Sequence, residues 1–283
     1  MKFFYHKITK YLQSIALLFG RQILKATSKE KIFSFYKTLQ PIKFPLIIIG
    51  KKNCDGSYIL PDDFVDVNHC ITFGVGSDVS FELDLVEKKI LSTCFDGTIE
   101  HSPSKNDCIK FVKKNIAPSN FFLNSLFPQS RHNCDYTDIN SAVCRILNNS
   151  GEKNDFILKM DIEGDEYKNI LDLKEEYLER MRILVFEFHF LNQIIHPDKF
   201  SIISSCFQKL LKNFHIVSIN QTYDNNFIAP YGQSFLYTTL EISFLRKDRF
   251  EKIEKVQSME SINFRIDKKE PNRLIHKTLF FDS

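Results

Sequence analysis

The chain of 283 residues is long enough to build one sizeable hydrophobic core with an appendage. Hydrophobic residues make up 43% of it and charged residues 26%, which excludes a disordered chain, and a net charge of +3 does not indicate nucleic-acid binding. Its seven cysteines are scattered without a C-x-x-C pair, so a zinc site is not expected and a reducing, cytoplasmic location is favoured.

The first segment, residues 3–38, places apolar residues at helical spacing among basic ones. Its most apolar part, residues 15–19, is far shorter than the ~20 residues of a membrane span, and no small-residue cleavage site follows it. Two interpretations stay open. The segment packs on the core or on a second subunit, or it rests through residues 1–40 as a basic amphipathic helix on the anionic inner face of a membrane.

Composition also suggests how the chain is divided. Pro41 and Pro45 separate a helical N-terminal extension, residues 1–45, from the rest of the chain. Residues 46–250 are expected to form the main domain. Residues 251–283 are expected to form a charged C-terminal tail.

From residue 46 onwards, apolar runs and helical patterns alternate along the chain. Strands are predicted at 46–49, 58–60, 70–75, 90–95, 120–126, 156–161, 182–188, 214–219 and 235–245, and helices at 79–89, 105–115, 138–149, 165–180 and 198–212. The alternation predicts an α/β fold, a Rossmann-like, doubly wound, mostly parallel seven-stranded sheet with helices on both faces. Residues 220–234 show no helical pattern, so the last strand is predicted to return antiparallel.

Two glycines one residue apart, Gly74 and Gly76, follow the strand at 70–75 and precede a helical pattern. About 20 residues further on, the next strand ends on Asp96. This layout is typical of a nucleotide-binding unit, in which the glycines let the backbone approach a ligand and the acid accepts hydrogen bonds from ribose hydroxyls.

Polar side chains also follow the other predicted strands. Because the carboxyl ends of parallel strands share one edge, these groups are expected to converge there. They are Ser77 and Asp78 after the strand at 70–75, Asp161, Glu163 and Glu166 at or just after the end of 156–161, Glu187 and His189 at the end of 182–188, and Asn220 after 214–219.

The segment at residues 159–166, Lys-Met-Asp-Ile-Glu-Gly-Asp-Glu, resembles the K-[IM]-D-[IV]-E-G-x-E motif of the FkbM-like family of S-adenosylmethionine-dependent methyltransferases. The resemblance covers roughly residues 46–248. Further motifs similar to those of the family lie at 50–60, 73–82, 95–98, 187–189 and 240–244.

This resemblance implies roles for particular residues. The backbone around Gly74, Gly76 and Ser77 would approach the methionine part of the cofactor, and Asp78 and Glu82 would hold its amino group or close the loop. Asp96 would bind the ribose. Near the adenine, residues 133–136 are candidates, with Asp135 preferred.

For catalysis, the resemblance and the strand ends point to Asp161, Glu187 and His189. A base within reach of the acceptor hydroxyl is sufficient, since the cofactor methyl group is already activated, and His189 is attractive because an unperturbed imidazole titrates near neutrality. A Mg²⁺ ion held by Asp161, Glu187 and Asn220 is the alternative, but no metal ligand is assigned because spacing does not show convergence. Glu163 and Glu166 have a structural interpretation too, Glu166 by complementing a helix dipole.

The function expected from these observations is methyl transfer from S-adenosylmethionine to a hydroxyl of a saccharide or a surface-glycan precursor. The saccharide rests on the family and on the richness in Phe, 28 residues, and in Lys, a bias of AT-rich bacterial genomes. Two alternatives remain, a nicotinamide-dependent oxidoreductase and a non-catalytic nucleotide- or partner-binding domain at a membrane surface. The missing third glycine argues against the first, and the intact cofactor motif against the second.

Overall fold

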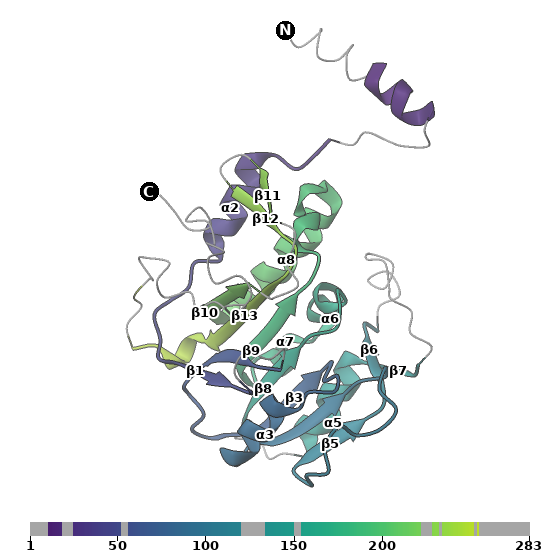
Figure 1. Cartoon of the computed structure of the whole chain (residues 1–283). Helices are drawn as coiled ribbons and strands as arrows, with labels where there is room; N and C mark the ends of the chain where they lie inside the picture. The colour runs from purple at the N-terminus through teal and green to yellow at the C-terminus, as the bar shows by residue number, and fades with distance from the viewer. Residues whose placement is uncertain are drawn as a thin grey trace.

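A mixed sheet of seven strands runs through the computed structural model, which describes residues 11–18, 25–51, 56–119, 134–149, 154–221, 228–231, 234–251 and 254 (Figure 1). Across the sheet, the strands lie in the order β10 (Phe214–Gln221), β13 (Leu240–Arg246), β9 (Met181–Phe188), β8 (Asp155–Met160), β3 (Val67–Phe73), β4 (Leu91–Phe95) and β5 (Ile109–Val112). The first of these strands in the chain, β3, therefore lies inside the sheet, with later strands on both sides.

Strand direction confirms the predicted fold class. The strands from β5 through β4, β3 and β8 to β9 pair in parallel, whereas β13 pairs antiparallel with both β9 and β10. A parallel neighbour needs a crossover of a dozen or more residues, usually a helix. The residues described between β10 and β13 form instead the antiparallel pair β11 (Ile228–Tyr231) and β12 (Ser234–Tyr237), so the last strand returns in the opposite direction.

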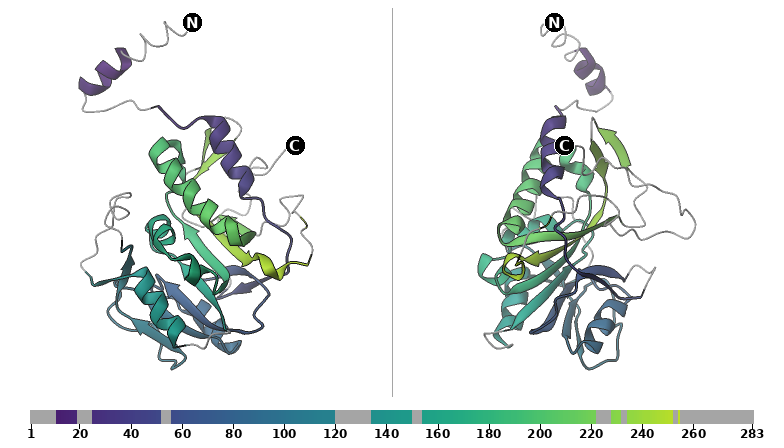
Figure 2. Two further views of the ribbon diagram at one scale, coloured as in Figure 1. Left: turned by 180° about the vertical axis from the view of Figure 1, so that it is seen from behind. Right: turned by 90° about the vertical axis from the view of Figure 1, so that its left-hand side faces the viewer.

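Both faces of the sheet are covered (Figure 2). One face carries α5 (Ile139–Asn148), α6 (Glu166–Asp172) and α8 (Pro197–Asn213), with α2 (Lys29–Thr38) packed beside α8. The other carries α3 (Ser80–Glu87) and the hairpin of β1 (Leu46–Ile49) and β2 (Tyr58–Pro61). The short elements are β6 (Asn115–Ala117) paired with β7 (Tyr136–Asp138), α7 (Glu175–Leu178), η1 (Leu191–Ile195) and η2 (Lys247–Arg249).

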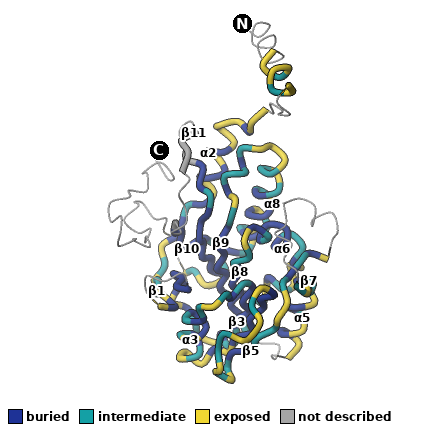
Figure 3. Tube along the Cα trace, turned by 45° about the vertical axis from the view of Figure 1, so that its right-hand side comes forward, coloured by how far each residue is buried: buried dark blue, intermediate teal, exposed yellow. Residues whose placement is uncertain are grey.

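The central strands are buried on both faces, as Figure 3 shows in dark blue. In β8, Ile157 packs on the side of α3 and the neighbouring Leu158 on the side of α8, and neither is exposed. Successive strand residues point to opposite faces, so a strand covered twice needs apolar residues at nearly every position. That is the continuous apolar pattern from which the strand was predicted.

The described parts of the N-terminal extension contain two helices. In α2, the ring of Phe35 packs edge-on against Phe207 of α8 at 5.2 Å, so this helix belongs to the main core. Residues 11–18 form a second helix whose large apolar side chains are exposed. None of the helices in the described part of the chain combines the length and apolarity of a membrane span.

One predicted helix, at residues 105–115, is wrong. The amide of Cys108 donates to the Asn106 side chain at 2.9 Å, and that of Asn106 donates to Ser104 at 3.1 Å. Such local hydrogen bonds compete with those of a helix, and the following residues pair with β4 as β5.

Two other predicted elements have different outcomes. The helix expected at 165–180 is divided into α6 and α7. The strand expected at 120–126 lies outside the described residues.

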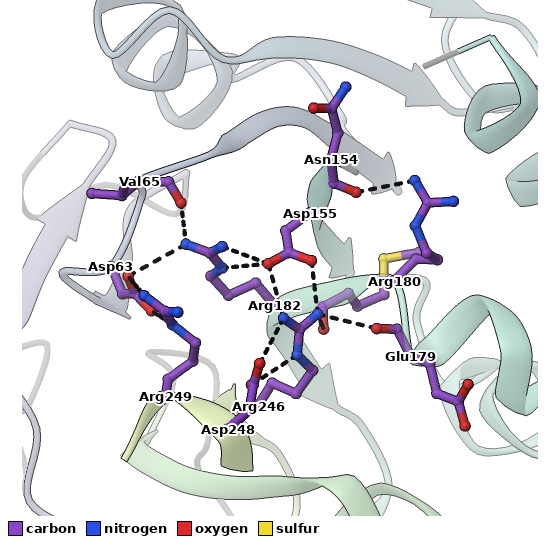
Figure 4. Close-up of polar contacts among 11 residues, drawn as sticks. Asp63, Val65, Asn154, Asp155, Glu179, Arg180, Arg182, Arg246, Asp248 and Arg249 are labelled. Atoms are coloured by element: carbon purple, nitrogen blue, oxygen red, sulfur yellow. Dashed lines mark hydrogen bonds and ion pairs between the residues drawn. The ribbon is translucent and has the colours of Figure 1, made fainter. Parts of the chain in front are cut away.

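At the amino ends of β8 and β9, a network of ion pairs joins segments far apart in the sequence (Figure 4). Asp155 at the start of β8 pairs with Arg182 of β9 at 2.5 Å and with Arg246 of β13 at 2.8 Å. Arg182 also donates to the carbonyl of Val65, and Arg249 pairs with Asp63 at 2.7 Å. The network fastens the end of the sheet opposite to the strand ends at which the polar residues were predicted to gather.

Candidate functional site

A cavity of about 360 Å³ opens at the carboxyl ends of β3, β4 and β8. The chain continues from β3 to β4 on one side, whereas β8 lies on its other side, and ligands of open α/β sheets bind at such a reversal. The cavity is lined by Gly56, Tyr58, Gly74, Val75, Gly76, Ser77, Asp78, Asp96, Thr98, Asn115, Ile116, Tyr136, Lys159, Asp161, Ile162, Glu163 and Asp165.

Both glycines of the loop after β3 adopt left-handed conformations, with φ of 76° at Gly74 and 57° at Gly76. A Cβ on Gly74 would lie 1.7 Å from the carbonyl oxygen of Asp161, so the ends of β3 and β8 touch through backbone alone. A Cβ on Gly76 would meet nothing within 4 Å. The first glycine thus permits a close approach, and the second permits the turn.

Asp96, at the end of β4, faces this loop. One carboxylate oxygen accepts from the amides of Val75 at 3.2 Å and Gly76 at 2.9 Å, and the other accepts from the amide and hydroxyl of Thr98 at 2.8 and 2.6 Å. Burial raises the pKa of Asp96, but these donors more than offset it and hold the pKa below its usual value. The carboxylate is therefore ionised at neutral pH and lies in the cavity wall.

Of the other residues predicted around the cofactor, two line the cavity and one is buried in the protein interior. Ser77 and Asp78 line the cavity, and Asp78 accepts from the amide of Ser80 at 2.9 Å. Glu82 is fully buried on α3 and accepts from the hydroxyl of Thr72 at 2.8 Å. Burial lowers the pKa of Lys159, but Glu82 and Asp161 raise it above its usual value, so Glu82 helps to hold a buried cation beneath the cavity.

On the side predicted for adenine, the wall consists of Asn115, Ile116 and Tyr136. Asp135 does not line the cavity, and its carbonyl accepts from the amide of Asn115 at 2.9 Å. Tyr136 follows it directly and does line the cavity. Asn133 lies outside the described residues.

Asp161, Glu187 and His189, the three predicted catalytic residues, come together. Their nearest ligand-type atoms all lie within 4.8 Å of one another. His189 Nε2 is 3.6 Å from Glu187 Oε1 and 3.9 Å from Asp161 Oδ1. Asp161 also lines the cavity, so it joins the cavity to this group, which we call the Asp161–Glu187–His189 cluster.

Glu166 is hydrogen-bonded to His189 of the cluster. Its carboxylate is fully buried, and Oε1 accepts from His189 Nδ1 at 3.0 Å and from the amides of Ile162 at 3.0 Å and Gly164 at 3.2 Å. Glu166 therefore orients the imidazole of His189, in addition to the structural role expected from its place in the first turn of α6. The carboxylate of Glu163 is exposed, with Oε2 3.5 Å from His189 Nε2.

These acids change the protonation of His189. Burial lowers its pKa, but the carboxylates of Glu166, Asp161 and Glu187 outweigh burial and raise the pKa to about 10. The near-neutral titration expected from an unperturbed imidazole is therefore wrong for this site. At neutral pH the ring is an imidazolium, which leaves proton acceptance to the carboxylates.

Tyr58 was missed by the sequence analysis as a site residue. Its hydroxyl donates to Asp161 Oδ2 at 2.8 Å, and the ammonium of Lys159 lies 4.6 Å from its ring centroid. Tyr58 belongs to the short strand β2, about a hundred residues from its partner, so no local pattern indicated the contact.

Asn220, considered as a metal ligand, is placed elsewhere. It is buried within β10, which extends beyond the predicted end, and its amide donates to Glu241 Oε1 at 3.1 Å. Most of the Asn-rich loop after it lies outside the described residues.

Comparison with known proteins adds little to this geometry. No family model and no curated protein matches the chain. A solved structure of a fibrillarin/Nop5p complex is similar with a TM-score of 0.34 and 13% identity, covering 64% of this chain and 73% of that chain. A similarity at this level supports no argument about what the chain does.

Proposed function

We propose that the protein transfers a methyl group from S-adenosylmethionine to a hydroxyl. The observation that carries the proposal is Asp96, whose carboxylate lies in the wall of the cavity and touches the glycine loop of the preceding strand. A carboxylate in this position recognises the two hydroxyls of a ribose. The motifs that resemble FkbM-like methyltransferases surround the same cavity, and this selects the cofactor.

The residues around the cavity fit such a cofactor. The volume of about 360 Å³ lies within the range of small-molecule sites. Ile116 and Tyr136 offer an apolar and aromatic wall for a base, and Asp78 offers a carboxylate for an amino group. The space in front of Gly76 leaves room for a ligand beside the backbone.

The cofactor, when bound, supplies an activated methyl group, so the protein has to orient the acceptor and remove one proton. Tyr58 holds Asp161 through Oδ2, which leaves Oδ1 toward the cluster. The proton of the acceptor hydroxyl passes to a carboxylate of the cluster, Asp161 or Glu187, and the adjacent imidazolium of His189 stabilises the ionised form of that carboxylate beforehand.

The acceptor class we propose is a saccharide or a surface-glycan precursor. Its support is the resemblance to the FkbM-like family together with the bacterial character of the composition. A nicotinamide-dependent oxidoreductase shares the ribose-binding acid, and direct titration distinguishes the two cofactors.

The test is calorimetric titration of the protein with S-adenosylmethionine, S-adenosylhomocysteine and a reduced nicotinamide. We expect micromolar binding of the first two, weakened about 10–100-fold in Asp96→Ala, since a hydrogen bond to a charged group contributes roughly 1.5–3 kcal/mol. The exposed acid variant Asp107→Ala, on the loop before β5, is the matched control and should bind like the wild type. Absence of binding by wild-type protein with a cooperative melting transition, or preference for the nicotinamide, would refute the proposal.

A further inference from the structure

The spacing within the Asp161–Glu187–His189 cluster is unusual for a set of hydrogen bonds. The separations of 3.6 and 3.9 Å from His189 Nε2 to the oxygens of Glu187 and Asp161 are longer than hydrogen bonds. Two ligands about 2.1 Å from one metal ion, at tetrahedral or wider angles, lie roughly 3.4–3.7 Å apart. The 3.6 Å separation falls in this range and the 3.9 Å separation slightly exceeds it, so the atoms stand close to the separation of ligands that share an ion.

We propose that Asp161, Glu187 and His189 bind a divalent transition-metal ion at the edge of the cavity. All three follow or end parallel strands, Asp161 after β8 and Glu187 and His189 at the end of β9, so a rigid sheet holds them. Three protein ligands leave coordination positions open, as catalytic metal sites require.

The surroundings of the ligands support this assignment independently. Histidines that bind metals almost always donate their second ring N–H to a carboxylate or a carbonyl, which fixes the tautomer and the ring orientation. His189 donates in this way from Nδ1 to Glu166, and a bound ion would take the place of the proton that Nε2 carries without it. Asp161 is held in the same manner, by the hydroxyl of Tyr58.

Charge favours a cation at this point. The imidazole of His189 is surrounded by the carboxylates of Asp161, Glu163, Glu166 and Glu187, and Glu187 and Glu166 are buried. Buried charges are costly unless they are paired or coordinate a metal. A dication between the ligand atoms, in place of the imidazolium proton, would add one net positive charge among these carboxylates.

The ligand set also selects the kind of ion. Mg²⁺ and Ca²⁺ prefer sites built of oxygen alone, whereas imidazole suits zinc and other first-row transition metals. We therefore assign the site to a first-row transition-metal ion such as Zn²⁺, for which Mn²⁺ serves as a more weakly bound probe. The sequence left Mg²⁺ held by Asp161, Glu187 and Asn220 as an alternative only; the amide of Asn220 donates to Glu241 instead, and His189 supplies the third ligand of the proposed site.

If the proposed methyl transfer is correct, and on that assumption alone, the ion would bind the oxygen of the acceptor hydroxyl and lower its pKa as a Lewis acid. The site itself does not depend on that assumption. Its occupancy is measured without the cofactor.

The test is titration of the full chain with Mn²⁺, followed by the loss of the EPR signal of the unbound ion. We expect one site per chain, lost when Zn²⁺ is added in equimolar amount and retained with excess Mg²⁺. The isosteric variants Glu187→Gln and Asp161→Asn, and also His189→Gln, should each bind at least about tenfold more weakly. His215→Gln, which removes a histidine on β10 outside the cluster, is the matched control and should bind normally.

Wild-type affinity no tighter than that of the three cluster variants, each with an intact melting transition, overturns the metal site. An equal loss in His215→Gln overturns it as well. Asp96→Ala separates the two proposals, because it should weaken S-adenosylmethionine binding about 10–100-fold and leave Mn²⁺ binding unchanged. Mn²⁺ binding without binding of the cofactor would therefore refute the methyltransferase proposal and leave the metal site standing.

Discussion

At the scale of single residues, the two glycines of the loop after β3 perform different tasks. Gly74→Ala would place a methyl group 1.7 Å from the carbonyl oxygen of Asp161, whereas Gly76→Ala would place it in open space. We expect Gly76→Ala to lower the free energy of unfolding by about 1–2 kcal/mol, the cost of a left-handed residue. We expect Gly74→Ala to lower it by about 3–5 kcal/mol, since overpacking adds to that cost.

Urea denaturation measures both values. The two variants are matched, since each adds one methyl group to a glycine with positive φ. Equal losses of stability would show that the contact between the ends of β3 and β8 does not constrain the loop.

The residues that sequence could identify are those that end a strand. Asp96 and Asp161 were found because each closes an apolar run, and the carboxyl ends of parallel strands meet at one edge. Tyr58 and Asn115 were not found, because their place in the cavity wall depends on contacts between short strands distant in the sequence. The high pKa of His189 was also beyond reach, since it depends on how several carboxylates surround one ring.

At the scale of elements, ion pairs rather than apolar contacts hold the amino ends of β8 and β9 to neighbouring segments (Figure 4). Arg182 is nearly buried and contacts Asp155, Asp63 and the carbonyl of Val65. Removal of one partner from a buried pair leaves the other charge uncompensated. We expect Arg182→Met to lower the free energy of unfolding by about 3 kcal/mol.

Lys113→Met is the control, since Lys113 and Glu100 form an exposed pair and the loss of stability should stay below about 1 kcal/mol.

Burial raises the pKa of Asp155, but Arg246 and Arg182 lower it below its usual value. The contribution of ionised Asp155 to the free energy of unfolding is thus intact above about pH 4, its unfolded-state pKa, and is lost as the pH falls through its lower folded-state pKa. The difference in stability between Arg182→Met and wild type should therefore shrink in acid. A difference that is the same at all pH values would contradict this explanation.

Sequence periodicity predicted the long elements better than the short ones. The strands β8 and β9 are covered on both faces and therefore carry unbroken apolar runs. The region before β5 was misjudged because Ser104 and Asn106 bind neighbouring amides and end any helix there, an effect that periodicity does not register.

At the scale of the whole molecule, the extension before the main domain contains one buried and one exposed helix. α2 packs into the core, and the amide of Thr27 donates to the carbonyl of Ile195 at 2.7 Å. Residues 11–18 instead present exposed apolar side chains, Leu18 at 83% and Leu17 at 60%, in a segment that the sequence flanks with basic residues. We propose that this first helix contacts an anionic membrane surface.

The chain should float with vesicles that contain anionic phospholipid and sediment with neutral ones. A double variant, Leu17→Glu with Leu18→Glu, should lose flotation and keep its melting temperature, because neither side chain is in the core. Flotation that is unaffected by this change would contradict a membrane contact through this helix.

The four hydrogen bonds of Asp96 have a consequence for the kinetics of ligand entry. Each oxygen of the carboxylate accepts from two donors, so no acceptor position is idle when a ribose arrives. The ribose hydroxyls have to displace hydrogen-bond donors of the glycine loop and of Thr98 from the carboxylate. The exchange requires the amides of Val75 and Gly76 to give up one carboxylate oxygen, so the loop has to move first. Association should therefore be slower than collision permits, with the rate set by the loop and not by diffusion.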